Sequence, residues 1–142
     1  MRLPALVAAL LVALAGPNHA QEAAGPRWRI GDDLAGTRWR AESIRGVPVA
    51  DPAAATLEFI LGDHVRGQAA CNRFVGPYAS RGDRLNLGPL RLSRLNCGPE
   101  GNELAASLVS ELRRASRVVL TDDRLELAPS SGPATVVLVR AP

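Results

Sequence analysis

The sequence contains no lysine, so each of its 17 basic side chains is an arginine. It has two cysteines, one tyrosine, and two each of tryptophan and phenylalanine in 142 residues. Proteins that bind nucleic acid usually combine clustered basic residues with stacking aromatics. Here the arginines are scattered along the chain, and aromatic residues make up only 4% of it. The composition therefore predicts no nucleic-acid partner, and the arginine bias is attributed to genome composition.

Several motifs that carry chemistry are absent from the sequence. It has no glycine-rich phosphate loop, no dinucleotide fingerprint and no Gly-x-Ser-x-Gly elbow. His64, the only histidine after residue 20, follows a Gly-Asp turn, where a solvated side chain is expected. Two cysteines and one histidine fall short of the four ligands of a structural zinc site. We therefore expect no enzymatic activity, no metal and no cofactor. Arg81-Gly82-Asp83 spells an adhesion tripeptide, but a turn explains it equally well.

The first twenty residues have the three parts of a secretory signal. A positive start, Met1-Arg2, precedes an apolar stretch of about 13 residues, too short for a permanent span of roughly 20. Gly16-Pro17 then breaks the helix, and Ala20 is a small residue suited to cleavage. We predict a signal peptide over 1–20, cleaved after Ala20, a flexible lead-in over 21–33 and one domain over 34–142; an uncleaved anchor is the alternative to cleavage. The mature protein is expected to be a periplasmic or secreted monomer without a membrane span.

Short runs of alternating apolar residues recur from residue 34 onward, separated by glycine, proline and aspartate. Leu57, Phe59 and Leu61 share one face by the two-residue period of a strand. The next run, Val65–Cys71, alternates so that Cys71 is expected to point toward the interior. Further strands are predicted at 36–44, 74–79, 84–87, 90–95, 118–120, 125–127 and 135–139.

The hydrophobic period changes between residues 100 and 114. Leu104, Leu108 and Leu112 recur every four residues, which predicts an amphipathic helix over this range. Acidic residues near its start and arginines near its end complement the helix dipole. The predicted fold class is mainly β with one α-helix, a small antiparallel β-barrel of seven or eight strands whose closure removes exposed edges. The helix would pack on the barrel or plug one end.

Cys71 and Cys97 are the only cysteines in a chain expected to be exported. In a small exported domain two cysteines most often form a disulfide. Closing a loop of about 27 residues would stabilise the fold by roughly 3.5 kcal/mol. Two free buried thiols remain an alternative. A redox-active pair has less support, because the Cys-x-x-Cys spacing is absent.

Four segments of the chain together resemble the META domain, the HslJ-like family. These segments are Leu34–Trp39, Ile44–Val49, Cys71–Tyr78 and Ser93–Cys97. Ala70 stands where the family usually has glycine, and Ser93 and Leu95 replace a usual threonine and methionine. The resemblance covers roughly residues 34–139 and implies a small β-barrel-like fold with one helix. It also implies association with the bacterial envelope and, for some members, with heat or antibiotic stress, but no established reaction or ligand.

The run Cys71-Asn72-Arg73-Phe74 is the most distinctive part of this resemblance, and it is either a binding or a structural motif. In the structural interpretation, Asn72 caps backbone groups at a tight turn and Arg73 pairs with a carboxylate. In the functional interpretation, the two residues form a polar recognition point near the barrel mouth. Phe74 belongs to the same motif, and both interpretations stay open at this point.

Together these features predict an exported, non-enzymatic protein that acts in envelope maintenance or stress tolerance by binding an envelope component. The partner would be an envelope protein or a small ligand. One alternative is a carrier, because barrels of about eight strands can hold one small apolar molecule. The other is a secreted inhibitor of another enzyme, a common role of small disulfide-braced β domains.

Overall fold

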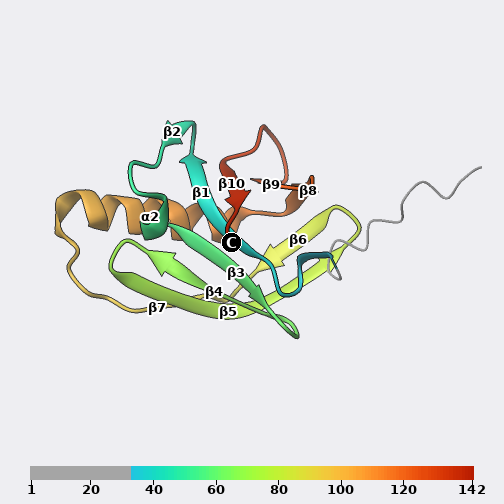
Figure 1. Ribbon diagram of the computed structural model, residues 1–142, viewed down its shortest axis with the longest axis horizontal. Helices are drawn as coiled ribbons and strands as arrows, with labels where there is room; N and C mark the ends of the chain where they lie inside the picture. Colours follow the sequence, from blue (N-terminus) through green and yellow to red (C-terminus); the bar gives the residue numbers. More distant parts are fainter. Residues whose placement is uncertain (1–32) are drawn as a thin grey trace, which may run out of the picture.

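Ten strands form one antiparallel sheet, and eight of them close into a barrel in the order β1-β3-β4-β5-β6-β8-β9-β10, with β10 returning to β1. The computed structural model describes residues 33–142 (Figure 1). The predicted signal peptide and all but the last residue of the predicted lead-in lie outside the described residues. The barrel strands are β1 (Arg38–Ile44), β3 (Thr56–Ile60), β4 (His64–Ala69), β5 (Asn72–Arg81), β6 (Arg84–Leu87), β8 (Arg117–Leu120), β9 (Arg124–Ala128) and β10 (Val136–Arg140).

Two short strands and one short helix lie outside the barrel circuit. Strand β2 (Val47–Pro48) pairs with the end of β1, and β7 (Arg91–Leu92) pairs with β5. The 3-10 helix η2 (Pro52–Ala54) follows β2 and is capped by Asp51, whose carboxylate accepts from the Ala53 amide at 3.1 Å. The predicted fold class, mainly β with one α-helix in a small barrel, is therefore confirmed.

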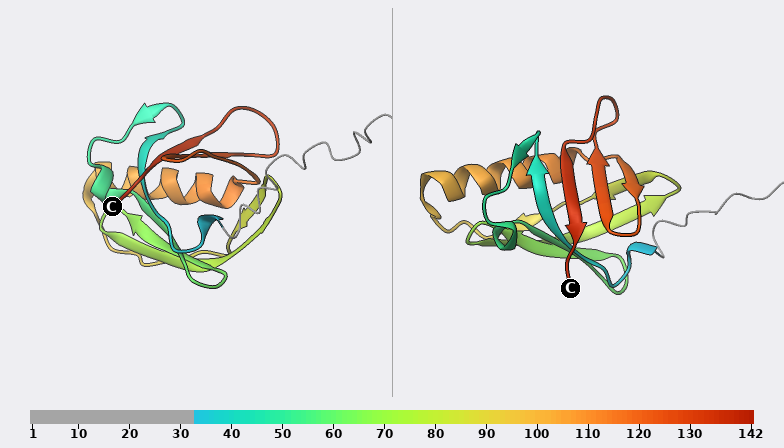
Figure 2. Two further views of the ribbon diagram at one scale, coloured as in Figure 1. Left: turned by 45° about the vertical axis from the view of Figure 1, so that its right-hand side comes forward. Right: turned by 45° about the horizontal axis from the view of Figure 1, so that its top comes forward.

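Helix α2 (Gly98–Arg114) plugs the barrel, as Figure 2 shows in its left view, where the strands surround it. Pro99 occupies its first turn, where a missing amide hydrogen costs nothing. Its buried face consists of Ala105, Leu108, Val109, Glu111 and Leu112, and it contacts β1, β4, β6 and β10. The helix begins two residues before the predicted start at residue 100. None of the helices in residues 33–142 has the length and hydropathy of a membrane span.

Two of the strand pairs that close the barrel differ in the length of their ladders. Strand β1 pairs with β10 over most of its length, and the Ala141 amide donates to the Arg38 carbonyl at 2.8 Å. Strands β6 and β8 share one residue pair, Arg84 and Arg117. In sequence, β7 and helix α2 lie between these two strands, and their ladder is the shortest of the circuit.

Aromatic side chains form part of the core. Trp39 and Phe59 are fully buried, and Phe59 meets Tyr78 edge to face at 5.0 Å. Phe74 lies opposite Gly67 on the neighbouring strand, and a Cβ placed on Gly67 would fall 2.4 Å from the phenyl ring. The ring therefore occupies the space that a side chain at position 67 would take, which is a known way of stabilising glycine in a sheet.

Two predictions about side-chain direction are wrong. Leu61 does not share the core face with Leu57 and Phe59, because β3 ends at Ile60 and Leu61 is 84% exposed. Cys71 does not point inward. Strand β4 ends at Ala69, and Ala70 adopts a left-handed φ of 56°, so the strand alternation stops before Cys71 and leaves it exposed.

Candidate binding site

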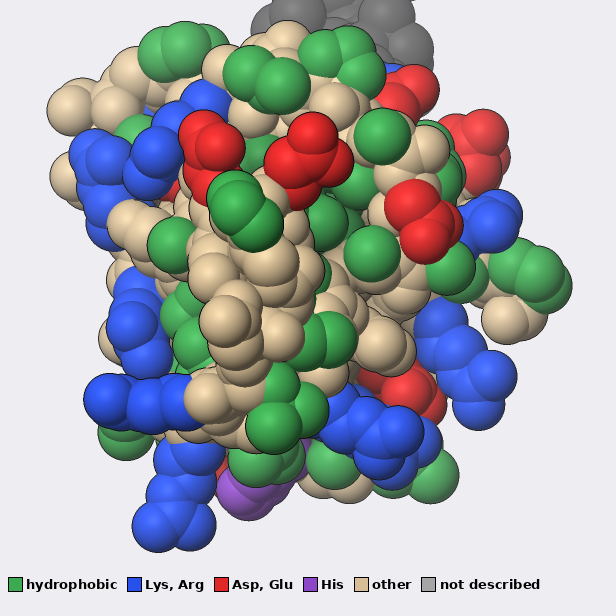
Figure 3. Space-filling view, turned by 90° about the vertical axis from the view of Figure 1, so that its left-hand side faces the viewer, with side chains coloured by type: hydrophobic (Ala, Val, Ile, Leu, Met, Phe, Trp, Pro, Cys, Tyr) green, Lys and Arg blue, Asp and Glu red, His purple; other side chains and the backbone are tan. Residues whose placement is uncertain are grey.

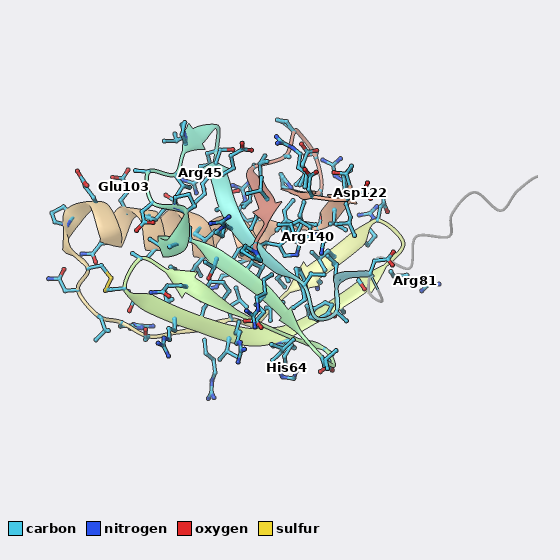
Figure 4. The ribbon with its side chains drawn as sticks, viewed as in Figure 1. Arg45, His64, Arg81, Glu103, Asp122 and Arg140 are labelled. Carbon is cyan, nitrogen blue, oxygen red and sulfur yellow. A yellow bond between two sulfur atoms is a disulfide. The ribbon has the colours of Figure 1, made fainter. Side chains whose placement is uncertain are left out.

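The motif around Cys71 joins two parts of the fold that are far apart in sequence. Cys71, in the turn between β4 and β5, forms a disulfide with Cys97, the residue that precedes helix α2. The two Cα atoms lie 5.5 Å apart. The predicted pairing is present, and the sulfur bridge is drawn at the left end of the molecule in Figure 4. It attaches the start of the helix to the β4–β5 turn.

Asn72 completes this attachment through hydrogen bonds. Its side chain is 5% exposed and lies against the segment that leads into the helix. Its Oδ1 accepts from the Leu95 amide at 2.7 Å and from the Ser93 hydroxyl at 2.9 Å, and its Nδ2 donates to the Leu95 carbonyl at 3.2 Å. The structural interpretation expects Asn72 to cap backbone groups at a tight turn, and the backbone groups that it binds are those of Leu95, in a segment more than twenty residues away. These hydrogen bonds give the buried amide of Asn72 the partners that it needs.

The two replacements in the Ser93–Cys97 segment, Ser93 and Leu95, fit this arrangement. The Ser93 hydroxyl also accepts from the Arg73 amide at 3.0 Å, and threonine would supply the same hydroxyl. Leu95 contributes only its backbone groups to the contact, and its side chain is 62% exposed. Both substitutions therefore preserve the contacts that position the segment.

The remaining two residues of the motif point in opposite directions. Phe74 is 2% exposed and belongs to the core. Arg73 is exposed on the outer wall of β5 and has no acidic partner among the described residues, so the predicted carboxylate pair is absent there. His64 lies at the exposed start of β4 with its Nδ1 2.8 Å from the Asp63 carboxylate. Gly82, with φ of 60°, forms the β5–β6 turn within the Arg-Gly-Asp tripeptide.

A groove of about 600 Å³ opens at the same end of the molecule, between the β1–β2 hairpin and the first turns of α2. Figure 3 looks onto this end, and Figure 4 labels Arg45 and Glu103 at its upper left. Apolar side chains from both walls line it, namely Ile44, Val47, Pro48, Val49, Ala50, Ala54, Ala70 and Leu104. Three carboxylates, those of Asp51, Glu100 and Glu103, stand among them.

An ion pair connects Arg45, on one wall of the groove, to Glu111 in the barrel interior. Glu111, whose side chain is fully buried, accepts from Arg45 Nε at 2.6 Å and lies 3.4 Å from Arg114. Burial raises the pKa of the Glu111 carboxyl, but hydrogen bonds from Arg45 and Thr135 and the charges of Arg45 and Arg114 outweigh it, so the pKa is lowered overall. Glu111 is therefore ionised at neutral pH and fixes Arg45, which has a left-handed φ of 52° in the hairpin turn.

Sequence comparison assigns the chain to a family of known domains. The model of the META domain family matches residues 32–142. The chain belongs to the META domain family. No curated protein matches the chain in sequence.

Two solved structures resemble this META domain in sequence and fold. One is an NMR structure of a protein 27% identical, covering 77% of this chain and 92% of its own, with a TM-score of 0.61. The other is an NMR structure of a protein from Burkholderia xenovorans, 25% identical, covering 88% of this chain and 98% of its own, with a TM-score of 0.66. A crystal structure of a DUF4847 family protein from Bacteroides vulgatus shares the fold alone, at 12% identity and a TM-score of 0.55.

The groove and the ion pair behind it were missed by the sequence analysis of this META domain. A signal for the ion pair exists in the helix. Glu111 lies three residues after Leu108 and one before Leu112, so it falls on the apolar stripe, where a carboxylate needs a partner. The signal does not identify Arg45 as that partner, because the two residues are 66 positions apart.

Proposed function

We propose that this META-domain protein, of the HslJ-like type, is exported and acts in envelope maintenance or stress tolerance by binding another envelope protein, without catalysing a reaction. The observation that supports the proposal is the groove between the β1–β2 hairpin and α2. Its volume of about 600 Å³ lies within the usual range of binding sites, and most of its lining is apolar.

The charges around the groove favour one kind of occupant. Asp51, Glu100 and Glu103 contribute three negative charges, whereas the positive charge of Arg45 is bound to Glu111. Complementary charges guide association and select partners. The groove is therefore suited to a short segment of a protein that carries apolar side chains between lysine or arginine residues.

The disulfide supports the exported location. Cys71–Cys97 is consistent with an oxidising compartment, and such bonds are rare in the reducing cytosol. The periplasm or the extracellular space is thus part of the proposal. The carrier alternative has less support, because helix α2 and the core side chains occupy the barrel interior where a ligand would lie. No observation favours the alternative of a secreted enzyme inhibitor over the binding of an envelope protein in the groove.

Site-specific photocrosslinking in intact cells tests the proposal. A photoreactive amino acid at Val47, 66% exposed on the groove wall, is expected to attach one defined envelope protein. The matched control places it at Val119 of β8, 57% exposed and outside the groove lining. Reversing the rim charges with Glu100→Lys and Glu103→Lys should abolish the adduct. Identical adducts at both positions, or an adduct that survives the charge reversal, would argue against the groove as the binding site.

A further inference from the structure

A second surface, separate from the groove, gathers arginines that are scattered in the sequence. Strand alternation points Arg38 and Arg40 of β1, Arg66 of β4, Arg73 of β5 and Arg91 of β7 outward from one side of the barrel. We call these five residues the arginine wall. In the end view of Figure 3, basic side chains dominate the lower half, near the purple histidine of β4, and acidic side chains lie mostly in the upper half.

The strand register places these side chains next to one another. Arg38 lies opposite Glu58, Glu58 opposite Arg66, Arg66 opposite Val75, and Val75 opposite Arg91, so four strands and β7 contribute to one row. Arg73 lies two residues before Val75 on the same face of β5, diagonal to both Arg66 and Arg91. Diagonal neighbours in antiparallel sheets are about 7–8 Å apart, within reach of long side chains.

One acidic residue, Glu58, shares this row. Arg66 donates to both of its carboxylate oxygens, at 2.9 and 3.1 Å, and Arg38 lies 3.4 Å away. The hydrogen bond from Arg66 is the largest cause that lowers the pKa of Glu58. Its single negative charge cannot offset the five arginines. Arg40, Arg73 and Arg91 have no acidic partner within residues 33–142, so their guanidinium groups are available to an external anion.

We propose that the arginine wall docks the protein on an anionic phospholipid bilayer. The wall is the open outer face of a sheet with a shallow depression of about 430 Å³, a shape suited to an extended surface. Guanidinium groups bind phosphate oxygens through paired hydrogen bonds. Val75, 43% exposed between Arg66 and Arg91, adds an apolar contact at the centre. Docking in this way leaves the acidic groove, which lies in the opposite half of Figure 3, free for its protein partner.

Vesicle cosedimentation of the mature protein tests this inference. Vesicles of phosphatidylcholine alone are compared with vesicles that contain about one third phosphatidylglycerol. Each basic residue near an anionic surface increases binding by about fivefold. The double variant Arg73→Gln/Arg91→Gln is therefore expected to bind the anionic vesicles about 25-fold more weakly. The matched control is Arg81→Gln/Arg84→Gln at the β5–β6 turn, which removes the same charge away from the wall and should retain most of the binding.

Each outcome of this experiment supports or overturns the proposal. Binding that requires phosphatidylglycerol, weakens at high salt and depends on Arg73 and Arg91 supports it. Failure of the wild-type protein to sediment with anionic vesicles at low salt overturns it. Equal loss in the two double variants overturns it too, because net charge and not the wall would then control binding. Equal affinity for a soluble polyanion such as heparin would replace the bilayer with a polyanionic partner. Circular dichroism confirms that the variants are folded.

Discussion

Ala70 adopts a left-handed backbone conformation, which its Cβ atom makes unfavourable. Its φ of 56° costs an L-residue about 1–2 kcal/mol, which explains the glycine usual in the family. Glycine loses about 0.5–1 kcal/mol more conformational entropy on folding than alanine. Ala70→Gly should therefore raise the free energy of unfolding by about 0.5–1 kcal/mol, measured by urea denaturation. Ala69→Gly, fully buried and without a positive φ, is the control and should be destabilised. Equal destabilisation of both variants would contradict the strain at position 70.

Glu111 makes the stability of the fold depend on pH. Its pKa is lowered in the folded state, so its contribution is fully present above the unfolded-state pKa and is lost as the pH falls through the folded-state pKa. Glu111→Gln should lower the free energy of unfolding at pH 7 by about 1–3 kcal/mol, because hydrogen bonds to a charged group are lost. The difference from the wild type should shrink on acidification below the ordinary pKa of a glutamate.

Denaturation curves between pH 7 and pH 3 measure this effect. Glu103→Gln, an exposed glutamate of the same helix, is the control and should change stability little. The lowered pKa of Glu58 acts in the same pH range, so Glu111→Gln should retain part of the acid sensitivity. A constant stability difference at all pH values would mean that Glu111 contributes through its shape and not through its charge.

At the scale of elements, two interactions attach the segment that begins helix α2 to the barrel. One is the disulfide and the other is the set of Asn72 hydrogen bonds. Replacing both cysteines with alanine should lower the free energy of unfolding by about 3.5 kcal/mol, because a closed loop with a sequence separation of 26 is released in the unfolded state. The Asn72 hydrogen bonds remain, so the native fold should persist and the Leu95 amide should stay partly protected from hydrogen exchange. In the Asn72→Ala variant with the disulfide intact, loss of Leu95 protection would show that the Asn72 hydrogen bonds act separately from the disulfide.

Element boundaries were predictable wherever a hydrophobic period exists. Helix α2 and most barrel strands follow from alternation or from the four-residue spacing of leucines. Strands β2 and β7 have two residues each, too few for a period. The direction of Cys71 was missed for a different reason, since a left-handed residue at Ala70 stops the alternation and alanine gives no warning of such an angle.

At the scale of the whole molecule, the barrel is expected to open first between β6 and β8. Only the Arg84–Arg117 pair and the hydrogen bonds that the Leu85 and Val118 amides donate link these strands, whereas β4 and β5 pair over six residues. Local opening follows low contact density. Native-state hydrogen exchange should therefore show lower protection for the Leu85 and Val118 amides than for amides of the β4–β5 ladder. Equal protection at both places would indicate that the closed barrel unfolds as one unit.

The two candidate surfaces depend on how the strands are arranged around the barrel. Arg73 and Arg91 become neighbours only because β7 returns beside β5, and Arg66 joins them through the β4–β5 register. The groove likewise needs the β1–β2 hairpin to face α2. Linear spacing carries no information on these long-range pairings, which is why scattered arginines were not recognised as one surface.

The hydrogen bond from Ala141 to Arg38 brings the two ends of the barrel circuit together. A circularly permuted barrel could therefore start at Gly82 in the β5–β6 turn, with a linker that connects the residues after Ala141 to those before Arg38. Such a permutant would keep every strand pair around the ring. It would also move both new termini to the end of the molecule where β5 meets β6, and so offer an attachment point for probes or surfaces away from the groove.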